Sequence, residues 1–417
     1  MGSKNTHKRQ VTRKAGGRYL GKGATGCTFI PAIRCRGQAA RRPGMISKLM
    51  LRDSAVGEMI IQPFLHAVDP TRRYFLGPVD ICVPEYELPE NTIPGECNVA
   101  GHNKRGPINI RTKNPLLVLF ENGGRDLEHI LEGDVPLTRE GGGRLLVGLA
   151  NLLEGLVHLH AADTAHLDIK LPNIVASIRD DASYNVRFID FGLTLNRTMM
   201  GSKTADELIH LTTNYYVWPY ELRNVYYART RGAATGIRDF YSPTVLNSMS
   251  PKIPTWMWYR NSDPILRTRE GEEMLQRARA ADPVSLIKAA DIYSMGRVLA
   301  EIFNKITGQE CVGPDRFNNT RGGVPDTISI PFWRLIVRMM NPDMFGRPNA
   351  AVVLAEYSAL LPLFREMYAP ITVSIGPNLA NNNNRNNNNN NDSWTYCNPS
   401  TWKCFRRGRT LRKPKIV

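Results

Sequence analysis

The chain has 417 residues and a formal net charge of +16; 42% of its residues are hydrophobic and 22% are charged. These values are typical of a soluble globular protein that is long enough for one large two-lobed domain or two ordinary domains. No uninterrupted apolar run approaches the roughly 18 residues of a membrane span, and the N-terminus lacks the apolar region of a secretory signal, so we expect neither.

The seven cysteines are odd in number and scattered along the chain, which does not predict a disulfide framework. Their spacing also fits no zinc-binding pattern. We therefore expect a reducing intracellular compartment. The spacings that fit no zinc-binding pattern are those between Cys27 and Cys35, between Cys82 and Cys97, and between Cys397 and Cys404.

The positive charge is concentrated at the two ends of the chain. Residues 1–18 contain six Lys or Arg and residues 403–417 contain seven, and neither segment contains an acidic residue. Such ends commonly contact nucleic acid, an anionic membrane or an acidic partner; the alternative is that they are solvated and disordered. The opening MGSKNT also fits the N-myristoylation pattern on Gly2, which would act with the basic arm to bind a membrane, unless the match is due to chance.

The N-terminal part of the chain predicts short strands. Residues 18–33 predict two strands joined by a glycine-rich turn, and MISKLM (45–50) suits a third strand. Residues 54–68 have helical spacing with Ser54 as a candidate N-cap, and Pro63 should end or kink this helix.

The remainder predicts a long inserted loop at residues 83–116, a short buried strand at 116–120, and then mostly helices. Leucines recur at helical spacing from residue 137, a strongly apolar helix is expected at 288–306, and two further helices follow in PFWRLIVRMM and AAVVLAEYSALLPLF. Strands first and helices later indicate an α+β protein with a small sheet lobe and a larger helical lobe.

This pattern divides the chain into four segments. The Asn-rich run at 381–391 cannot bury a core, so the last segment is expected to be a disordered tail. The segments are a basic arm (1–18), a β-rich N-lobe with the inserted loop (19–118), a helical C-lobe with an insertion at 223–287 (119–370), and an Asn-rich and basic tail (371–417).

The stretch AHLDIKLPNIV (165–175) places Asp168, Lys170 and Asn173 among apolar residues. Buried polar groups need partners, so this stretch is either a self-satisfied turn or a site for a charged ligand. Asp190 follows in an Asp-Phe-Gly sequence at the end of a short predicted strand.

Two further features upstream point to phosphate chemistry. The turn GKGATG (21–26) lets backbone N–H groups approach a phosphate, although an ordinary glycine hairpin would look the same. Lys48 lies in an apolar strand, where it either extends to the sheet edge or meets an anion, and Glu58 on the next helix is within reach as its partner.

Taken in order, these marks resemble those of a eukaryotic-type protein kinase over residues 19–363. WPYE (218–221) resembles the family's Ala-Pro-Glu, DIYSMG (291–296) resembles its next helix, and Arg347 matches its late arginine. The N-terminal run also resembles serine/threonine kinases of nucleocytoplasmic large DNA viruses, which would locate the protein in host cytoplasm or the virion.

The resemblance implies a bilobal kinase fold, ATP and Mg²⁺, and transfer of the γ-phosphate to Ser or Thr of protein substrates. Asp168 would be the catalytic base, Lys170 would neutralise the transferring phosphoryl group, and Asn173 and Asp190 would hold Mg²⁺. These polar groups would then be satisfied only when nucleotide and metal arrive.

Leu119 would be the gatekeeper, with residues 120–122 as the hinge. The implied ATP-binding residues are Gly21, Lys22, Gly23, Ala24, Thr25, Gly26, Thr28, Lys48, Glu58, Phe120 and Asn122, and the structural residues are Glu221, Asp291 and Arg347, with Glu221 and Arg347 as a buried ion pair.

The sequence also departs from the family's pattern. Leu167 replaces the usual arginine, Tyr220 interrupts Ala-Pro-Glu, and Ile46 and Ser47 replace the usual residues before the lysine. Two alternatives to an active kinase remain: a pseudokinase that acts as a nucleotide-binding scaffold, and a small-molecule kinase. The survival of the lysine and both expected metal ligands argues against the first, and Asp-Phe-Gly with a Pro-x-Glu segment argues against the second.

Overall fold

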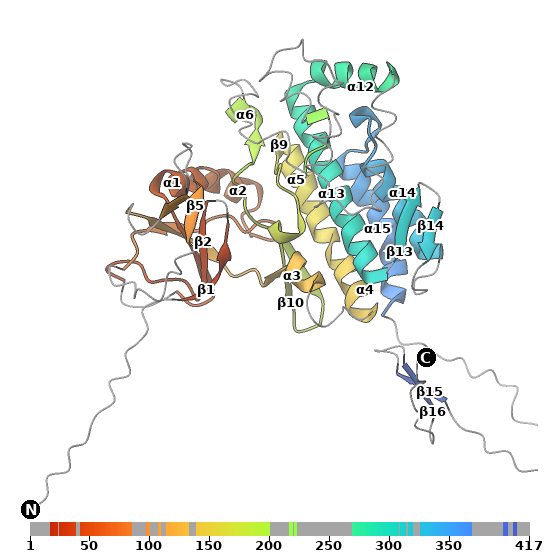
Figure 1. Cartoon of the computed structure of the whole chain (residues 1–417), viewed down its shortest axis with the longest axis horizontal. Coiled ribbons are helices and arrows are strands. Elements are labelled where there is room, and N and C mark those ends of the chain that lie inside the picture. Colours follow the sequence, from red (N-terminus) through yellow and green to blue (C-terminus); the bar gives the residue numbers. More distant parts are fainter. Residues whose placement is uncertain are drawn as a thin grey trace, which may run out of the picture.

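A computed structural model gives the fold of the chain, which is mixed α+β (Figure 1). Residues 1–16 of the basic arm, with Gly2, and also Ala24 and Tyr220 lie outside the described residues. The structure describes residues 17–23, 25–38, 42–85, 97–100, 107–109, 114–132, 139–200, 217–219, 221–222, 269–307, 309–313, 316–319, 326–368, 395–398 and 403–406.

A five-stranded antiparallel sheet forms the N-terminal part, in the order β1–β2–β3–β7–β4. The two predicted strands around the glycine turn and the predicted third strand are confirmed. β1 begins inside the predicted basic arm, and β7 runs across the predicted boundary between lobes at 118/119. The strands are β1 (Arg18–Lys22), β2 (Gly26–Ile30), β3 (Met45–Met50), β7 (Leu116–Glu121) and β4 (Asp80–Cys82).

The register between β3 and β7 assigns side chains to the two faces of this sheet. Lys48 pairs with Val118 and Ser47 pairs with Leu119, and successive side chains of a strand point to opposite faces. Val118 therefore shares a face with Lys48, and Leu119 lies on the other face, where it packs with Cys35. The expectation that Leu119 is the gatekeeper is wrong, because Leu119 lies on the face away from Lys48, whereas Val118 and Phe120 lie on the Lys48 face.

Two short helices, α1 (Arg52–Ile60) and α2 (Gln62–Val68), lie beside the sheet where one helix was predicted (Figure 1). The break falls at Ile61 because Pro63 occupies the first turn of α2, where its missing N–H costs nothing. The predicted cap at Ser54 is wrong, since α1 already begins two residues before it.

Two disulfide bonds, Cys27–Cys97 and Cys35–Cys82, lie on the face of the sheet opposite Lys48. The expectation that the cysteines form no disulfide is wrong. The bonded residues are 70 and 47 positions apart in the sequence, so only the folded chain brings them together.

The predicted loop at 83–116 contains a strand pair. β5 (Asn98–Ala100) and β6 (Pro107–Asn109) pair antiparallel with each other, directly after Cys97. This part of the predicted loop is therefore tied to the sheet through the disulfide of Cys97.

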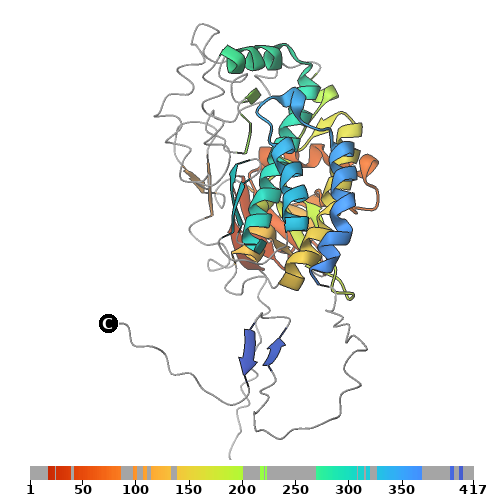
Figure 2. The ribbon, with the colours of Figure 1, turned by 90° about the vertical axis from the view of Figure 1, so that its right-hand side faces the viewer.

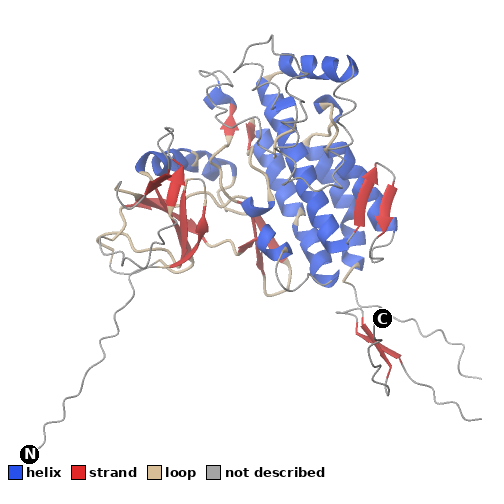
Figure 3. Cartoon of the chain, viewed as in Figure 1, coloured by secondary structure: helices blue, strands red, loops and turns tan. Residues whose placement is uncertain are grey.

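Helices form most of the C-terminal part, and their apolar faces meet in the largest hydrophobic core (Figures 2 and 3). The leucine periodicity from residue 137 is confirmed by the burial of Leu145, Leu146, Leu149, Leu152, Leu153, Leu156 and Leu159. The main helices are α4 (Arg139–Gly148), α5 (Ala150–Ala161), α13 (Pro283–Thr307), α14 (Asp326–Met339) and α15 (Ala350–Glu366).

Several short elements accompany these helices. β8, β10 and β11 form a three-stranded sheet in the order β11–β10–β8, and β9 pairs with β12. The elements are β8 (Arg125–Asp126), α3 (Leu127–Leu131), β9 (Thr164–Ala165), the 3₁₀ turn η2 (Leu171–Asn173), β10 (Ile174–Ile178), β11 (Tyr184–Phe188), β12 (Leu195–Asn196), α6 (Arg197–Met200) and the 3₁₀ turn η5 (Met344–Gly346).

Three other regions differ from the sequence-based expectation. The predicted insertion at 223–287 contains α12 (Arg269–Ala280), and α13 begins within it. The strands β13 (Gln309–Gly313) and β14 (Arg316–Asn319) pair after α13. The predicted disordered tail contains the antiparallel pair β15 (Thr395–Asn398) and β16 (Lys403–Arg406), which lies apart from the helices (Figure 1). Among the described helices, none has the length and apolarity needed to span a bilayer.

Candidate active site

The loop between α5 and β10 brings Asp168, Lys170 and Asn173 into contact. The Nζ atom of Lys170 lies 2.9 Å from Oδ1 of Asp168, and Nδ2 of Asn173 donates to Oδ2 of Asp168 at 2.7 Å. Nδ2 of Asn173 also donates to the backbone O of Asp168 at 3.0 Å. The expectation that these groups are satisfied only by nucleotide and metal is therefore wrong, since Asp168 has partners in the chain itself.

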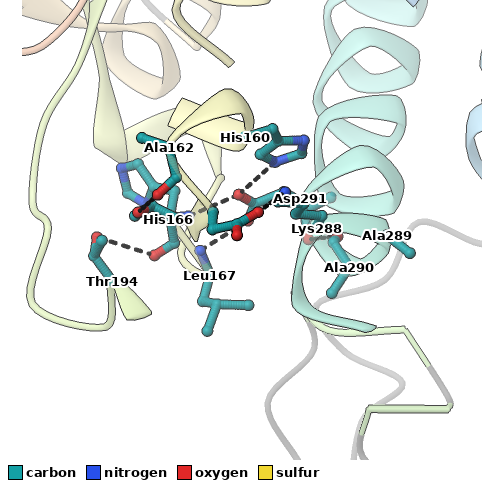
Figure 4. Close-up of polar contacts among 12 residues, drawn as sticks. His160, Ala162, His166, Leu167, Thr194, Lys288, Ala289, Ala290 and Asp291 are labelled. Carbon is teal, nitrogen blue, oxygen red and sulfur yellow. Dashed lines mark hydrogen bonds and ion pairs between the residues drawn. The ribbon is translucent and has the colours of Figure 1, made fainter. Parts of the chain in front are cut away.

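Asp291 on α13 lies beside this loop and contacts it (Figure 4). Its Oδ2 accepts from the backbone N of His166 at 2.7 Å, and its Oδ1 accepts from the backbone N of Leu167 at 2.8 Å. The Nε2 atom of His160 lies 3.3 Å from the same Oδ2. A fully buried carboxylate with this set of partners fixes the backbone directly before Asp168.

Trp218 fixes the same loop from another side. Its Nε1 donates to the backbone O of Leu167 at 2.8 Å, and both side chains belong to one buried cluster. His160 and Trp218 were not predicted from the sequence as positioning residues. No local pattern signals these roles, because both contacts join segments that are far apart in the sequence.

Lys48, Glu58 and Asp190 form a second cluster. The Nζ of Lys48 lies 3.1 Å from Oε2 of Glu58 on α1 and 3.9 Å from Oδ1 of Asp190. Burial lowers the pKa of Lys48, but the carboxylates of Asp190 and Glu58 raise it by more, so its pKa lies above the ordinary value. The predicted pairing of Lys48 with Glu58 is confirmed, and Lys48 is a fixed positive charge at neutral pH.

The two clusters are neighbours because the chain returns beside the loop at Ile189. The backbone N of Ile189 donates to the O of Asn173 at 3.0 Å, and Nε2 of His166 lies 3.2 Å from the O of Ile189. The ring of His166 packs on that of Phe191, with centroids 4.8 Å apart. Asp190 is thus held between Lys48 and the loop that carries Asp168.

The glycine turn lies at the end of the same sheet. Thr28 pairs with Lys48 in the β2–β3 register and so shares its face, whereas Lys22 and Thr25 in the turn are exposed. A Cβ atom at Gly21 would meet nothing within 4 Å, but one at Gly26 would lie 2.5 Å from the backbone O of Leu49. Gly26 is therefore required by packing, and the open space at Gly21 is available to a ligand.

The end of β7 carries the other two predicted nucleotide contacts. Phe120 pairs with Ile46 and lies on the face that carries Lys48. The backbone N of Asn122 donates to the O of Gly44 at 2.9 Å, and its side-chain Oδ1 accepts from the backbone N of Gly124 at 3.1 Å. Asn122 therefore has a turn-forming role in the structure, which the sequence reasoning did not assign.

The predicted ion pair of Glu221 and Arg347 is confirmed. Nη1 of Arg347 lies 2.5 Å from Oε1 of Glu221, and Nη2 lies 3.2 Å from Oε2. The Glu221 side chain is 4% exposed and the Arg347 side chain is 1% exposed. This bidentate geometry holds the end of the segment from Asp190 to Glu221 on the helical part.

Asn173 and Asp190 suit a hard cation such as Mg²⁺. The Asp190 side chain is 41% exposed, and the Asn173 amide nitrogen is committed to Asp168, which directs the amide oxygen elsewhere. In the part of the chain that the structure describes, no group of three or more His, Cys, Asp or Glu forms a self-contained metal site. One carboxylate and one amide fit Mg²⁺ that takes its remaining ligands from water and substrate phosphates.

Comparison of the chain with models of protein families and with curated proteins found no match.

Proposed function

We propose that this chain is an ATP-dependent protein kinase that transfers the γ-phosphate to Ser or Thr of protein substrates. The observation that carries the proposal is the position of Lys48 between Glu58 and Asp190, 3.1 Å and 3.9 Å from their carboxylate oxygens, beside the loop of Asp168 and Asn173. A fixed ammonium, an exposed carboxylate and an amide gathered next to an open glycine turn suit a nucleoside triphosphate with its divalent cation.

The overall arrangement supports the same proposal. The sheet part carries the glycine turn and Lys48, and the helical part carries the loop of Asp168 (Figure 1). We infer a bilobal kinase-like fold in which the nucleotide lies between the two parts. Val118 and Phe120, on the Lys48 face of β7, would then contact the base.

The residues of the loop have distinct roles in this proposal. Asp168 orients the acceptor hydroxyl and accepts its proton, and Lys170 stabilises charge on the transferred group. Asn173 and Asp190 would hold Mg²⁺, which would supply positive charge that neutralises the nucleotide phosphates. The contact of Lys170 with Asp168, at 2.9 Å, supports transfer to a hydroxyl at this point, because the ammonium then lies beside the attacking oxygen.

The test is transfer of labelled phosphate from ATP with Mg²⁺ to a generic basic protein such as histone. Asp168→Asn and Asp190→Asn should each reduce transfer on the order of 10²-fold or more, because each removes a preorganised charged group. Asp180→Asn is the matched control, since Asp180 is an exposed carboxylate in the turn between β10 and β11. Both site variants should keep the wild-type melting temperature.

Near wild-type transfer by either site variant at saturating ATP would contradict the assigned roles. Nucleotide binding without transfer in the wild type would indicate a nucleotide-binding scaffold. Transfer to small hydroxyl compounds in preference to protein would indicate a small-molecule kinase.

A further inference from the structure

The disulfide Cys27–Cys97 joins the strand after the glycine turn to the inserted segment. Cys27 directly follows Gly26 in β2, and Cys97 directly precedes β5. Both cysteines are buried, in a cluster with Leu49 and Leu117 on the face opposite Lys48. The bond therefore lies on the outer side of the strands whose inner side carries Thr28 and Lys48.

The second disulfide, Cys35–Cys82, is not the main connection between the two segments that it joins. Around Cys35–Cys82, the guanidinium of Arg34 lies 2.5 Å from the Glu85 carboxylate, and the backbone N of Arg36 donates to the O of Val83 at 2.9 Å. These contacts join the same two segments as the disulfide and do not depend on it. That end of the inserted segment should stay in place when Cys35–Cys82 is reduced.

The segment beyond Cys97 depends more on its disulfide. The strands β5 and β6 have three residues each and form a sheet of their own, separate from the main sheet. A two-stranded ribbon of that length is marginally stable without further support. The Cys27–Cys97 bond is a covalent support that holds its first residue on the main sheet.

The position of Cys27 is coupled to the glycine turn through the backbone. Cys27 pairs with Leu49 and with Lys22, so it is held in register with both neighbouring strands. The turn is closed by the N of Gly23 donating to the O of Gly26 at 2.8 Å. A shift of Cys27 would therefore move Gly26, the turn and the neighbouring Thr28 together.

We propose that reversible oxidation of Cys27 and Cys97 controls how tightly the glycine turn holds the phosphates of a nucleotide. The proposal rests on the proposed function for the identity of the ligand. The oxidised form, with the outer face covered and β2 fixed, binds nucleotide more tightly. Reduction removes the covalent link between β2 and the inserted segment while β2 stays paired with β1 and β3, and the turn then loses part of the preorganisation on which its affinity depends.

The chemistry is thiol–disulfide exchange with a low-molecular-weight disulfide such as glutathione disulfide. One protein thiolate attacks a sulfur of glutathione disulfide, which forms a mixed disulfide and releases one glutathione thiolate. The second protein thiolate attacks the protein sulfur of the mixed disulfide and releases the second glutathione. Two protein thiols are thus oxidised, one glutathione disulfide is reduced to two glutathione molecules, and a dithiol reverses the reaction.

The experiment measures the affinity of the whole chain for Mg-ATP in defined redox states. The protein is incubated with a dithiol or with glutathione disulfide, and the thiols are counted by alkylation and mass spectrometry. We expect reduction to weaken Mg-ATP binding by about tenfold, and glutathione disulfide to restore it. Cys27→Ser with Cys97→Ser should have the weak affinity in both conditions.

Cys35→Ser with Cys82→Ser is the matched control, because it removes the other disulfide from the same face. It should bind Mg-ATP as the oxidised wild type does and still respond to the dithiol. Equal affinity of oxidised and fully reduced wild type would overturn the proposal. So would a folded protein in which Cys27 and Cys97 stay free thiols in the presence of glutathione disulfide.

Hydrogen exchange of residues 18–30 gives a readout that needs no nucleotide and no variant. Faster exchange of this segment in the reduced wild type supports the proposal, and unchanged exchange overturns it. If neither redox form binds Mg-ATP, the proposed function fails, and the exchange result still decides whether Cys27–Cys97 fixes the turn.

Discussion

Leu167 and Asp190 have left-handed backbone conformations, with φ angles of 62° and 61°. For residues other than glycine such conformations cost about 1–3 kcal/mol, and they persist where the surrounding structure holds them. Here the N of Leu167 donates to Asp291, and the neighbour of Asp190, Ile189, donates to the O of Asn173. The two strained residues lie next to the two clusters of the candidate active site. Hydrogen bonds from the surrounding structure hold them there, at a cost in local backbone stability.

Leu167 leads to a prediction about regulation. Under the proposed function, Leu167 stands where most protein kinases have an arginine that pairs with a phosphorylated residue, but Leu167 is 1% exposed and packs with Trp218. Arg197 does not replace it, because its Nε lies 2.8 Å from Asp163. We expect activity to be independent of phosphorylation in the segment from Asp190 to Glu221.

The test is to treat active enzyme with a phosphatase, confirm by mass spectrometry that residues 190–221 carry no phosphate, and compare initial rates. The rates should agree within about twofold. A tenfold loss would mean that another basic group takes the place of the missing arginine. The candidates for phosphorylation, Ser202, Thr204, Thr212 and Thr213, and the candidate partner Lys203 lie outside the described residues.

Glu58 gives a pH-dependence prediction. Burial raises the pKa of the Glu58 carboxyl, against the lowering effect of Lys48, so the pKa lies above the ordinary value of 4.5. A raised carboxyl pKa means that, as the pH falls, Glu58 loses its charge earlier than an exposed glutamate. The ion pair with Lys48 is then lost, and Mg-ATP affinity should fall at a mildly acidic pH that leaves exposed carboxylates charged.

The measurement is Mg-ATP affinity from pH 7 down to the acid limit of folding, for the wild type and for Glu58→Gln. The variant carries no titrating group at this position and should lack this transition. Parallel pH profiles for the two proteins would show that the transition belongs to another group.

At the scale of elements, the glycine turn combines a packed end and an open end. Gly26 begins β2 against β3, and a Cβ there would lie 2.5 Å from the O of Leu49, whereas a Cβ at Gly23 would lie 3.7 Å from its nearest neighbour, the O of Gly26. The same motif thus contains one glycine that the fold needs and others that leave room for a ligand. Sequence alone does not separate these two reasons.

Alanine substitutions should distinguish the glycine that packing requires from the glycines that leave room for a ligand. Gly26→Ala should destabilise the protein by about 1–3 kcal/mol because the backbone must move to admit the methyl group. Gly23→Ala should keep the melting temperature and weaken Mg-ATP binding, because its methyl group occupies space that a phosphate would approach. Gly57→Ala on α1, where a Cβ meets nothing within 4 Å, is the matched control. Unchanged Mg-ATP affinity of Gly23→Ala would exclude the turn as a phosphate site.

At the scale of the whole molecule, buried polar contacts connect distant parts of the chain. The N of Phe188 donates to the O of Tyr74 at 2.9 Å, which joins the segment after α2 to β11. Asp291 connects α13 to the loop of Asp168, and Arg347 connects η5 to Glu221. The site is therefore supported from the sheet part, the helices and the end of the Asp190–Glu221 segment.

The effect of replacing Arg347 on stability should depend strongly on whether Glu221 is still present. Arg347→Met should destabilise the protein by about 3–5 kcal/mol, because it leaves the Glu221 carboxylate buried without its partner. Adding Glu221→Leu to Arg347→Met should recover much of that loss. The surface variant Arg338→Met, which breaks the exposed pair with Glu356, should cost no more than about 1 kcal/mol.

Urea unfolding followed by circular dichroism measures the free energy of unfolding of these variants. A double variant as unstable as Arg347→Met would mean that Arg347 stabilises the fold through its bonds to the backbone of Asn341 and Ala289 rather than through Glu221.

The sequence by itself determined the local elements and the residues gathered at the site. Strand propensity around GKGATG, the leucine periodicity of α4 and α5 and the interruption at Pro63 are local properties, which can be recognised from neighbouring residues. The spacing of Lys48 and Glu58 also predicted that these two side chains meet, the resemblance to protein kinases implied that Glu221 meets Arg347, and both pairs form.

Only the tertiary structure decided which distant groups meet and on which face. One step of register between β3 and β7 exchanges Val118 and Leu119 between the two faces of the sheet, and no local pattern sets that step. Cys27 and Cys97 are separated by 70 residues, so their spacing carries no signal of the bond. The mutual contacts of Asp168, Lys170 and Asn173 likewise depend on the shape of a loop that Asp291 and Trp218 hold from other parts of the chain. Contacts of this kind form only when distant segments pack together in the folded chain, so no local sequence pattern predicts them.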